Sequence, residues 1–387
     1  MSTQKKISAA EDDHKHYLEV RDSEYVELLA YAAKSSGRSV MKTQLDFNKV
    51  SKVPGRLNMV EYVRNGLHHI DRYTDSERAA FISNDLHWPI THKCNHNGWS
   101  AAAEDKVVAY TLLEAAGVPV PKTLAVIDKS NRIYPRLKTI ATAEQLRDVL
   151  LENLGSGLFG KITEGMVSFG AFLVKDANET TIVCEGRDPV SYETFLAEIV
   201  GDNSYVLQSV IQNHPDISQY ASALATVRMV NLVRENDVYC PMAIIKIPQG
   251  DNIADAFWRP GNIACSVNVE TGKIETVARR ADKEVEFLDD HPEVKGLMGL
   301  QLPFWRELVE VNERAARTFA PIRYQSTDIS ITESGPVVVE LNYGGGFDLP
   351  QYASGRGMLT SEVREFFEGF GWDFNEQPKK KFWPFRR

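Results

Sequence analysis

The first hundred residues carry their apolar side chains at the spacing of helices rather than of strands. The segment 25–32 shows this spacing, with one acidic residue among apolar ones. Thr74 and Glu77 have the identities and spacing of a helix capping box, in which each side chain bonds to the other residue's backbone. The pattern therefore predicts a helical N-terminal region, residues 1–100.

After residue 100 the predicted helices and strands alternate unevenly. One helix should run from about Ala103 to Ala116 and stop at Gly117, because the Val-Pro-Val-Pro sequence of residues 118–121 forces an extended chain. The remaining predicted elements are a strand at 123–127, a helix capped by Thr142 and Gln145 that ends near Leu154, two short strands around a glycine-rich connection at 158–174, strands at 205–210, 226–232 and 242–247, a helix at 304–319 and a hairpin at 327–342. This order predicts an α+β fold rather than a regular βαβ winding.

Length and composition favour more than one lobe. The chain has 387 residues, of which 43% are hydrophobic and 10% aromatic, which is enough to fill large cores and long for a single domain. We therefore expect two or three lobes.

The hairpin at 327–342 has polar residues where a core strand would have apolar ones. Side chains alternate along a strand, so Glu340 and Asn342 share one side of theirs. A turn at residues 334–335 would bring Asp328 within one residue of the position opposite Glu340. Two carboxylates and an amide suit Mg²⁺, which often bridges protein carboxylates to nucleotide phosphates. The hairpin thus predicts a site for Mg²⁺ and ATP, and the alternative is a surface hairpin whose acids face water.

The motifs of the common phosphate-binding loops do not occur, since the chain has no GxxxxGK[ST] and no GxGxxG after a strand. Lys161 instead precedes a glycine-rich loop that contains Ser168, and such a loop could close over phosphates that the ammonium also reaches. Lys106 lies near the start of a helix, where backbone N–H groups favour an anion. The alternative in both cases is an ordinary solvated lysine.

Two charged residues interrupt apolar strands. Arg228 lies within Ala-Thr-Val-Arg-Met-Val, and Lys246 ends Ala-Ile-Ile-Lys. A buried charge needs a partner, and an arginine here could clamp a transferring phosphoryl group or an acyl phosphate. A structural ion pair or an outward-facing side chain would explain Arg228 equally well, and Lys246 has the same two interpretations.

The formal net charge of −9 argues against nonspecific binding of nucleic acid, which needs a basic surface. The four cysteines are scattered without CxxC spacing, the first residues lack an apolar signal region, and no apolar run reaches 18 residues. These features predict a cytoplasmic protein without a nucleic-acid partner.

Metal-binding residue types gather at four nearby positions, His87, His92, Cys94 and His96. Neither the spacing of structural zinc sites nor HExxH is met. The segment is therefore interpreted as a loop whose polar groups are hydrogen-bonded or line a nucleotide cleft, with a metal site as the alternative.

The last residues, 373–387, form a basic aromatic tail on an otherwise acidic protein. Such a tail could touch an anionic membrane surface or a partner. A disordered tail that packs its aromatic rings on the body of the protein explains the composition at least as well.

In their order and spacing, several motifs of the chain resemble those of the ATP-grasp superfamily, in particular its sugar-transfer-associated branch, which is related to α-L-glutamate ligases. These motifs are Asp105-Lys106 before residues 117–121, Phe159-Gly160-Lys161 with the glycine-rich loop, residues 206–215, residues 225–228, Asp255 with residues 261–263, His291-Pro292, and Asp328 with residues 340–342. Three positions depart from the pattern. Gln208 stands where many such enzymes have an acid, Lys246 where this branch often has arginine, and Ser326 where some ligases have arginine.

The resemblance implies an ATP-grasp fold, in which two α+β lobes clamp ATP and follow the helical N-terminal region. It implies a lid lobe with a lead-in helix at 101–207, a large lobe with the metal site at 208–372, and the tail at 373–387. The implied site residues are Lys106 and Lys161 on the ATP phosphates, Ser168 in the closing loop, Gln208, Ser209, Val210, Ile211 and Gln212 in the hinge that holds adenine, Asp328, Glu340 and Asn342 on Mg²⁺, and Arg228 and Lys246 in catalysis.

The resemblance also implies an ADP-forming carboxylate–amine ligase. ATP would phosphorylate a small-molecule carboxylate, and a small-molecule amine would attack the acyl phosphate with loss of phosphate, in polysaccharide or small-peptide biosynthesis. Two alternatives stay open. An ATP-dependent small-molecule kinase would stop after phosphoryl transfer to a hydroxyl, and a noncatalytic scaffold would bind ATP without turnover.

Overall fold

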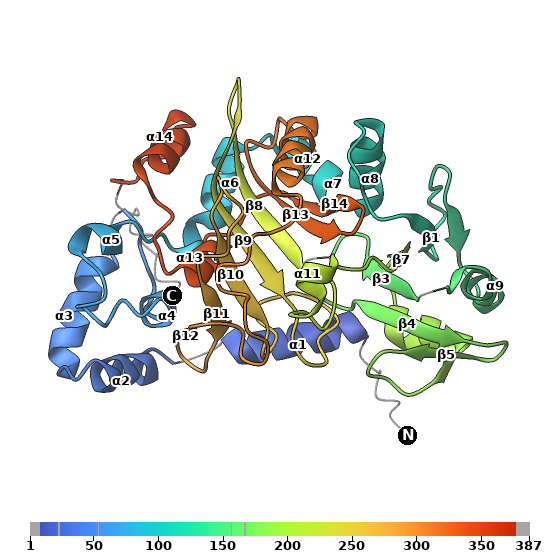
Figure 1. The fold of residues 1–387 in the computed structure, drawn as a ribbon, viewed down its shortest axis with the longest axis horizontal. Coiled ribbons are helices and arrows are strands. Elements are labelled where there is room, and N and C mark those ends of the chain that lie inside the picture. The colour runs from blue at the N-terminus through green and yellow to red at the C-terminus, as the bar shows by residue number, and fades with distance from the viewer. Residues whose placement is uncertain (1–7, 22–23, 53, 156, 166–167, 377–387) are drawn as a thin grey trace, which may run out of the picture.

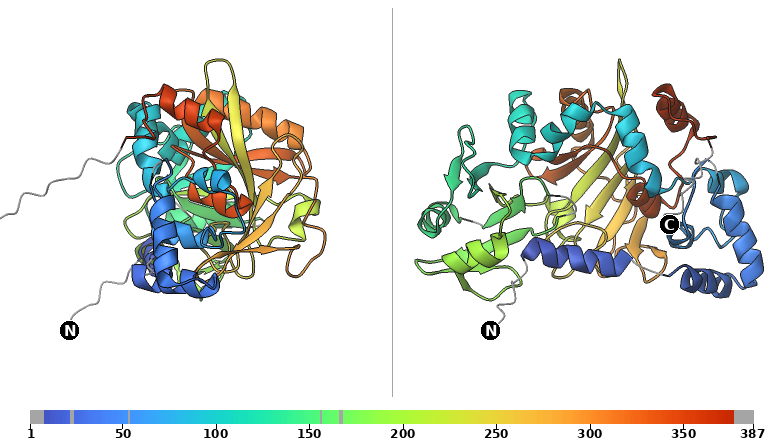
Figure 2. Two further views of the ribbon diagram at one scale, coloured as in Figure 1. Left: turned by 90° about the vertical axis from the view of Figure 1, so that its left-hand side faces the viewer. Right: turned by 180° about the vertical axis from the view of Figure 1, so that it is seen from behind.

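The computed structural model describes residues 8–21, 24–52, 54–155, 157–165 and 168–376. Two seven-stranded sheets lie side by side, and a group of N-terminal helices, α2 to α5, lies at the far end of the second sheet (Figure 1). Helix α1 runs alone from the first sheet to the second (Figure 2). Of the predicted tail at 373–387, residues 377–387 lie outside the described part.

The first sheet has the spatial order β2-β1-β7-β3-β4-β5-β6 and the second β12-β11-β10-β9-β8-β13-β14. The strands of the first are β1 (Thr123–Ile127), β2 (Lys138–Ile140), β3 (Leu158–Ile162), β4 (Phe172–Ala177), β5 (Thr181–Cys184), β6 (Val190–Ser191) and β7 (Tyr205–Ser209). Those of the second are β8 (Thr226–Val233), β9 (Val238–Ile247), β10 (Ile263–Val267), β11 (Val277–Arg280), β12 (Val285–Leu288), β13 (Tyr324–Thr332) and β14 (Gly335–Asn342). Among these neighbours only β1 and β2 pair in parallel, so the fold class is α+β, as predicted.

The described part of the N-terminal region is helical, as predicted. Its helices are α1 (Ala9–Arg21), α2 (Tyr25–Ser35), α3 (Val40–Val50), α4 (Met59–Arg64), α5 (Asp75–Ala79), η1 (Asn84–Leu86), α6 (His87–Cys94) and η2 (Asn97–Trp99). The predicted capping box is present at α5, where Thr74 accepts from the backbone N–H of Glu77 and the Glu77 carboxylate accepts from that of Thr74. Within the described residues, no helix combines the length and apolar composition needed to cross a bilayer.

The later helices include the three predicted near 103–116, 142–154 and 304–319, of which the first is divided, and several short ones that were not predicted. They are α7 (Ser100–Glu104), α8 (Lys106–Ala115), α9 (Ala143–Asn153), α10 (Tyr192–Thr194), η3 (Phe195–Val200), α11 (Pro215–Ser218), α12 (Trp305–Thr318), α13 (Asp348–Ser354) and α14 (Ser361–Gly369). The single helix expected at 103–116 is divided at Asp105, whose backbone is extended. Its carboxylate caps α8 by accepting from the N–H groups of Val107 and Val108 at 2.9 and 3.1 Å.

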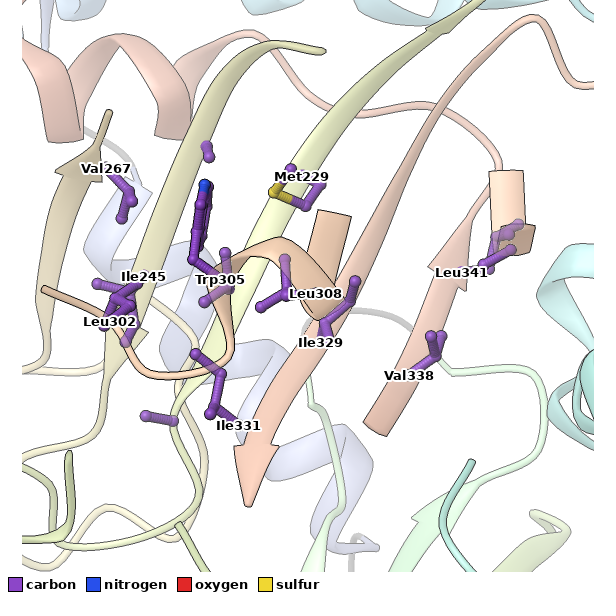
Figure 3. Close-up of a cluster of buried hydrophobic side chains, with 14 of the residues drawn as sticks. Met229, Ile245, Val267, Leu302, Trp305, Leu308, Ile329, Ile331, Val338 and Leu341 are labelled. Carbon is purple, nitrogen blue, oxygen red and sulfur yellow. The ribbon is translucent and has the colours of Figure 1, made fainter. Parts of the chain in front are cut away.

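The two faces of the second sheet have different partners. On one face, Trp305 and Leu308 of α12 pack against strand side chains such as Ile329 (Figure 3). On the other face, Tyr324 and Phe347 belong to an apolar cluster that includes residues of α6, α13 and α14. Alternation along the strands gives this second face polar residues beyond the apolar cluster, and the candidate site lies there.

One buried acid should make the stability of the helical region depend on pH. Glu61 of α4 accepts hydrogen bonds from the backbone N–H groups of Asn58 and Asn84 at 3.0 and 2.6 Å. Burial, the largest influence, raises the pKa of Glu61 from 4.5 to about 7. The folded state therefore keeps a proton that the unfolded chain has lost, so this contribution is full below pH 4.5 and declines up to pH 7, by up to about 3 kcal/mol.

Urea unfolding of the wild type and Glu61→Gln between pH 4.5 and 7.5 measures this decline. The variant cannot ionise at this position, so its free energy of unfolding should fall less over the interval. Parallel pH profiles would contradict the prediction.

Candidate functional site

A row of charged side chains crosses three neighbouring strands on the face of the second sheet opposite α12. Arg228 of β8 lies directly opposite Asp328 of β13, which lies opposite Glu340 of β14. Residues paired in this way point to the same side of a sheet. Lys246 of β9 joins the row, because it pairs with Thr226, two residues from Arg228. The structure thus brings together the predicted catalytic and metal-binding residues.

A β-bulge at Val339 creates this arrangement. In the hairpin, Ile329 lies opposite Val338, but the next pair is Asp328 with Glu340, which leaves Val339 as the extra residue. Without it, alternation would place Val339 opposite Asp328 and turn Glu340 towards α12. The bulge therefore decides which face of the sheet carries the second carboxylate.

Asp328 is buried and held by two cations. Arg228 donates from Nε to Oδ1 at 2.9 Å and from Nη2 to Oδ2 at 2.8 Å. The Nζ atom of Lys246 lies 3.1 Å from Oδ2 of Asp328 and 3.1 Å from Oδ2 of Asp255, which also accepts from Thr226. Burial by itself would raise the pKa of Asp328, but the charges of Arg228 and Lys246 hold that pKa below its ordinary value. Asp328 is therefore ionised, as a metal ligand must be.

The two lysines predicted to bind phosphate reach the same place. Nζ of Lys106 lies 2.9 Å from Oε1 of Glu340 and donates to the carbonyl oxygen of Gly165 at 2.9 Å. Lys161 donates to the carbonyl oxygen of the bulge residue Val339 at 3.0 Å. Burial would raise the pKa of Glu340, but Lys106 and Lys161 hold it below its ordinary value, while burial lowers the pKa of Lys161.

The residues present fit an Mg²⁺ ion and a triphosphate. Asp328 and Glu340 offer carboxylate oxygens, and Asn342 offers an amide on the same face, opposite Ser326. Four cations surround these acids, Arg228, Lys246, Lys106 and Lys161. With Asp255, the cluster contains four positive and three negative side chains. When a metal ion and phosphates bind, these side chains would exchange their present ion pairs for new ones, so no unpaired charge would be buried.

The predicted adenine hinge links the two sheets. Gln208 is buried in β7, and its amide donates to the hydroxyl of Thr123 at 3.2 Å. The N–H of Ser209, the last residue of β7, donates to the carbonyl oxygen of Lys122 at 3.1 Å. The next three residues, Val210, Ile211 and Gln212, lie in the connection between β7 and α11. Adenine binding by this segment stays a prediction.

Helix α1 holds the glycine-rich loop, of which residues 166–167 lie outside the described part. Asp13 of α1 accepts from the backbone N–H of Gly170 at 2.9 Å and from Arg259 at 3.2 Å. Arg259 also donates to the carbonyl oxygen of Ser168 at 3.4 Å. The loop of the first sheet is thereby tied to a segment that follows β9 in the second.

Replacing Asp13 by Asn should loosen the loop and weaken ATP binding. The negative charge of Asp13 attracts Arg259 and strengthens the hydrogen bond from Gly170, and the variant lacks this charge. We expect its loss to cost about 1 kcal/mol, which corresponds to roughly a fivefold higher Kd for ATP. Calorimetric titration of ATP with Mg²⁺ measures this change. Asp12→Asn is the matched control, since Asp12 is exposed on the same helix. Equal Kd values for the two variants would contradict the prediction.

Most of the segment interpreted as a polar loop or zinc site is the helix α6, so the expected loop is wrong for residues 87–94. His96 lies beyond the helix, where its Nδ1 accepts from the backbone N–H of Gly98 at 3.2 Å. The ring of His87 packs against Tyr324 and Phe347, and burial lowers the pKa of His87 to about 4. His92 stacks on Trp88. A helix results because Ile90 and Cys94, four residues apart, are both buried on one side. Over the described residues, no grouping of metal-ligating side chains at metal-binding distance includes these positions.

Residues 89–365 match the model of a protein family described as sugar-transfer associated ATP-grasp, and this stretch is well over half of the chain. The chain belongs to the sugar-transfer associated ATP-grasp family. Both sheets and the charged row of this ATP-grasp protein lie within the matched residues.

Several solved ligases are distantly similar to this ATP-grasp protein. VanG D-Ala:D-Ser ligase from Enterococcus faecalis has 14% identity over 68% of this chain and 61% of its own, with a TM-score of 0.39. D-Alanine–D-alanine ligase from Bacillus anthracis has 16% identity, 69% and 67% coverage and a TM-score of 0.37. Phosphoribosylamine–glycine ligase from Thermotoga maritima has 12% identity, 71% and 56% coverage and a TM-score of 0.38.

This ATP-grasp protein thus spans about three fifths of the length of VanG. No curated protein sequence matches it significantly.

Sequence reasoning did not find every residue of the site. Asp255 entered only through the family resemblance, yet it shares Lys246 with Asp328. Tyr110 of α8 donates its hydroxyl to the carbonyl oxygen of Val339 at 2.7 Å, beside Lys161. Nothing in the apolar pattern of α8 distinguishes this tyrosine from a core residue.

Proposed function

We propose that this ATP-grasp protein is an ADP-forming ligase that joins the carboxylate of one small molecule to the amine of another through an acyl phosphate. The observation that carries the proposal is the row of Arg228, Asp328 and Glu340, with Lys246 and Lys106 beside the two acids. Reactions that transfer a phosphoryl group need mainly alignment and charge neutralisation, and this row offers both. Family membership supports ATP as the phosphoryl donor.

In the first step, an oxygen of the substrate carboxylate attacks the γ-phosphorus, the bond to the bridging oxygen breaks, and ADP leaves. Lys106 and Lys161 would bind the phosphates, and Arg228 would turn from Asp328 to the transferring group. Mg²⁺ held by Asp328, Glu340 and Asn342 would supply further neutralisation of phosphate charge.

In the second step, the amine nitrogen attacks the carbonyl carbon of the acyl phosphate. The bond between that carbon and the phosphate oxygen breaks, inorganic phosphate leaves, and the nitrogen loses a proton as the amide forms. Water would compete for the same carbon. The loop that α1 ties down through Asp13 is well placed to exclude it.

The family's association with sugar transfer suggests where such an amide is made. We propose that the substrates belong to polysaccharide or small-peptide biosynthesis and that the reaction takes place in the cytoplasm, where ATP is abundant.

Calorimetric titration of ATP with Mg²⁺ into the wild type, Lys161→Ala and Glu340→Gln tests the nucleotide site, with GTP as the control ligand. Lys175→Ala is the matched control variant, because Lys175 is an exposed lysine of the same sheet. We expect saturable ATP binding in the wild type and Lys175→Ala, and its loss in the other two. Absence of binding in the wild type would remove the proposal.

Carboxylates and amines can then be screened for release of ADP and phosphate. The ligase requires that both be released only when an amine is present. A stable phosphorylated hydroxyl product without need of an amine would instead identify a kinase, and binding without turnover would identify an ATP-binding scaffold.

A further inference from the structure

Two consecutive histidines and a glutamate converge where the helical N-terminal region meets the second sheet. His68 and His69 follow α4, and Glu284 lies in the turn between β11 and β12. Nε2 of His68 lies 3.1 Å from Oε1 of Glu284, and Nε2 of His69 lies 3.3 Å from both carboxylate oxygens. The three ligand atoms lie within 4.8 Å of one another. This cluster is separate from the charged row.

These separations suit a shared metal ion. Zinc binds imidazole nitrogen and carboxylate oxygen at about 2.0–2.1 Å in a tetrahedron, which places neighbouring ligand atoms about 3.3 Å apart. The distances of 3.1 and 3.3 Å from the histidine nitrogens to Glu284 agree with that edge. The His69 separations are also longer than an ordinary N–H···O hydrogen bond.

Three possible donors converge on one oxygen of the Glu284 carboxylate. Oε1 of Glu284 has three neighbours, the hydroxyl of Tyr31 at 2.8 Å and the nitrogens of His68 and His69 at 3.1 and 3.3 Å. Nε2 of His68 also lies 3.0 Å from the hydroxyl of Ser35. A cation would bind the lone pairs of both imidazoles and of the carboxylate at once, whereas hydrogen bonds require a proton on each nitrogen.

The exposure of the two histidine side chains allows an ion to enter the cluster from solvent and to be held there. The side chain of His69 is 34% exposed, which opens a path from solvent, while that of His68 is fully buried. The hydroxyl of Tyr31 or a water molecule can complete a fourth position. Two imidazoles and one carboxylate favour zinc or a similar transition metal, whereas the all-oxygen donors of the charged row favour Mg²⁺.

We propose that His68, His69 and Glu284 bind a transition-metal dication, with zinc the best match to the donors. The ion fastens the helical N-terminal region to the second sheet, because it joins residues 216 positions apart in the chain. Its role is to hold these parts together, and its binding is independent of ATP.

Cobalt titration of the full-length protein after chelator treatment tests the proposal, because Co²⁺ in a tetrahedral site absorbs visible light. We expect one Co²⁺ per chain, displaced by Zn²⁺ and retained in excess Mg²⁺ and in Glu340→Gln. His69→Gln and Glu284→Gln should weaken binding at least about tenfold. His92→Gln is the control, because His92 is an exposed histidine of helix α6 that lies outside the cluster.

Absence of a tetrahedral cobalt spectrum in the wild type would overturn the proposal without any variant, so a folding defect in Glu284→Gln does not affect the test. Equal affinities of His69→Gln and the wild type would also overturn it. So would a loss of binding in His92→Gln with none in His69→Gln. Zn²⁺ should raise the unfolding temperature of the wild type by several degrees and leave that of His69→Gln unchanged.

Discussion

Glu340→Gln should lower the rate of ATP turnover at least about a thousandfold. The amide keeps the size of the side chain but removes the charge that binds Mg²⁺, and a metal ion contributes several kcal/mol to stabilising a transferring phosphoryl group. The variant also removes the anionic partner of Lys106, which lies 2.9 Å from Glu340. Release of ADP gives the rate, measured for the variant and the wild type at the same ATP concentration with the substrates found by screening.

The control is Glu333→Gln, which makes the same chemical change at the exposed turn of the same hairpin. Its turnover should equal that of the wild type. Unchanged turnover in Glu340→Gln would exclude both the ligase and the kinase, since each depends on the metal site.

Arg228→Met should destabilise the protein by about 3–5 kcal/mol and abolish turnover. The change leaves Lys246 as the remaining cation of this row beside the buried carboxylate of Asp328. Removing one partner of a buried ion pair typically lowers the free energy of unfolding by about 3–5 kcal/mol. Urea unfolding of the variant and the wild type measures the loss of stability.

Two further variants separate structure from catalysis. Adding Asp328→Asn to Arg228→Met should restore much of the stability, because the unpaired carboxylate is gone, but no turnover. Arg228→Lys keeps a positive charge but cannot make the bidentate contact with the carboxylate of Asp328. Its free energy of unfolding should therefore exceed that of Arg228→Met, while its turnover stays below that of the wild type. A double variant as unstable as Arg228→Met would show that the ion pair is not the source of the effect.

The site hairpin could be predicted from alternation alone, but not its register. The turn expected at 334–335 lies one residue earlier, since Thr332 pairs with Gly335. In either register an unbulged hairpin would leave Glu340 one residue from the position opposite Asp328, and the bulge at Val339 makes the two residues a direct pair. A bulge has no strong sequence signal when its residue is valine, because valine also favours regular strands.

Elements of the fold were predictable where the periodicity of apolar residues is strong. The helices α9 and α12 and strands β7 to β9 lie within a few residues of the expected ranges. Strands β10, β11 and β12 were missed because each has only four or five residues. Strand β10 also follows a segment, 250–262, that is rich in glycine, asparagine and aspartate. The contact of Asp13 with Gly170 was also beyond sequence reasoning, because an acid in an exposed helical pattern does not indicate a distant partner.

The position of α1 sets an order of events during synthesis of the protein. Asp13 leaves the ribosome 157 residues before Gly170 and 246 residues before Arg259, the two groups that it binds. Because domains fold from the N-terminus as they emerge, the first sheet can form while α1 still has no second attachment point. On a nascent chain the glycine-rich loop should therefore be tied to α1 through Gly170 alone. Nucleotide would be enclosed only after the second sheet, with its charged row, has begun to assemble.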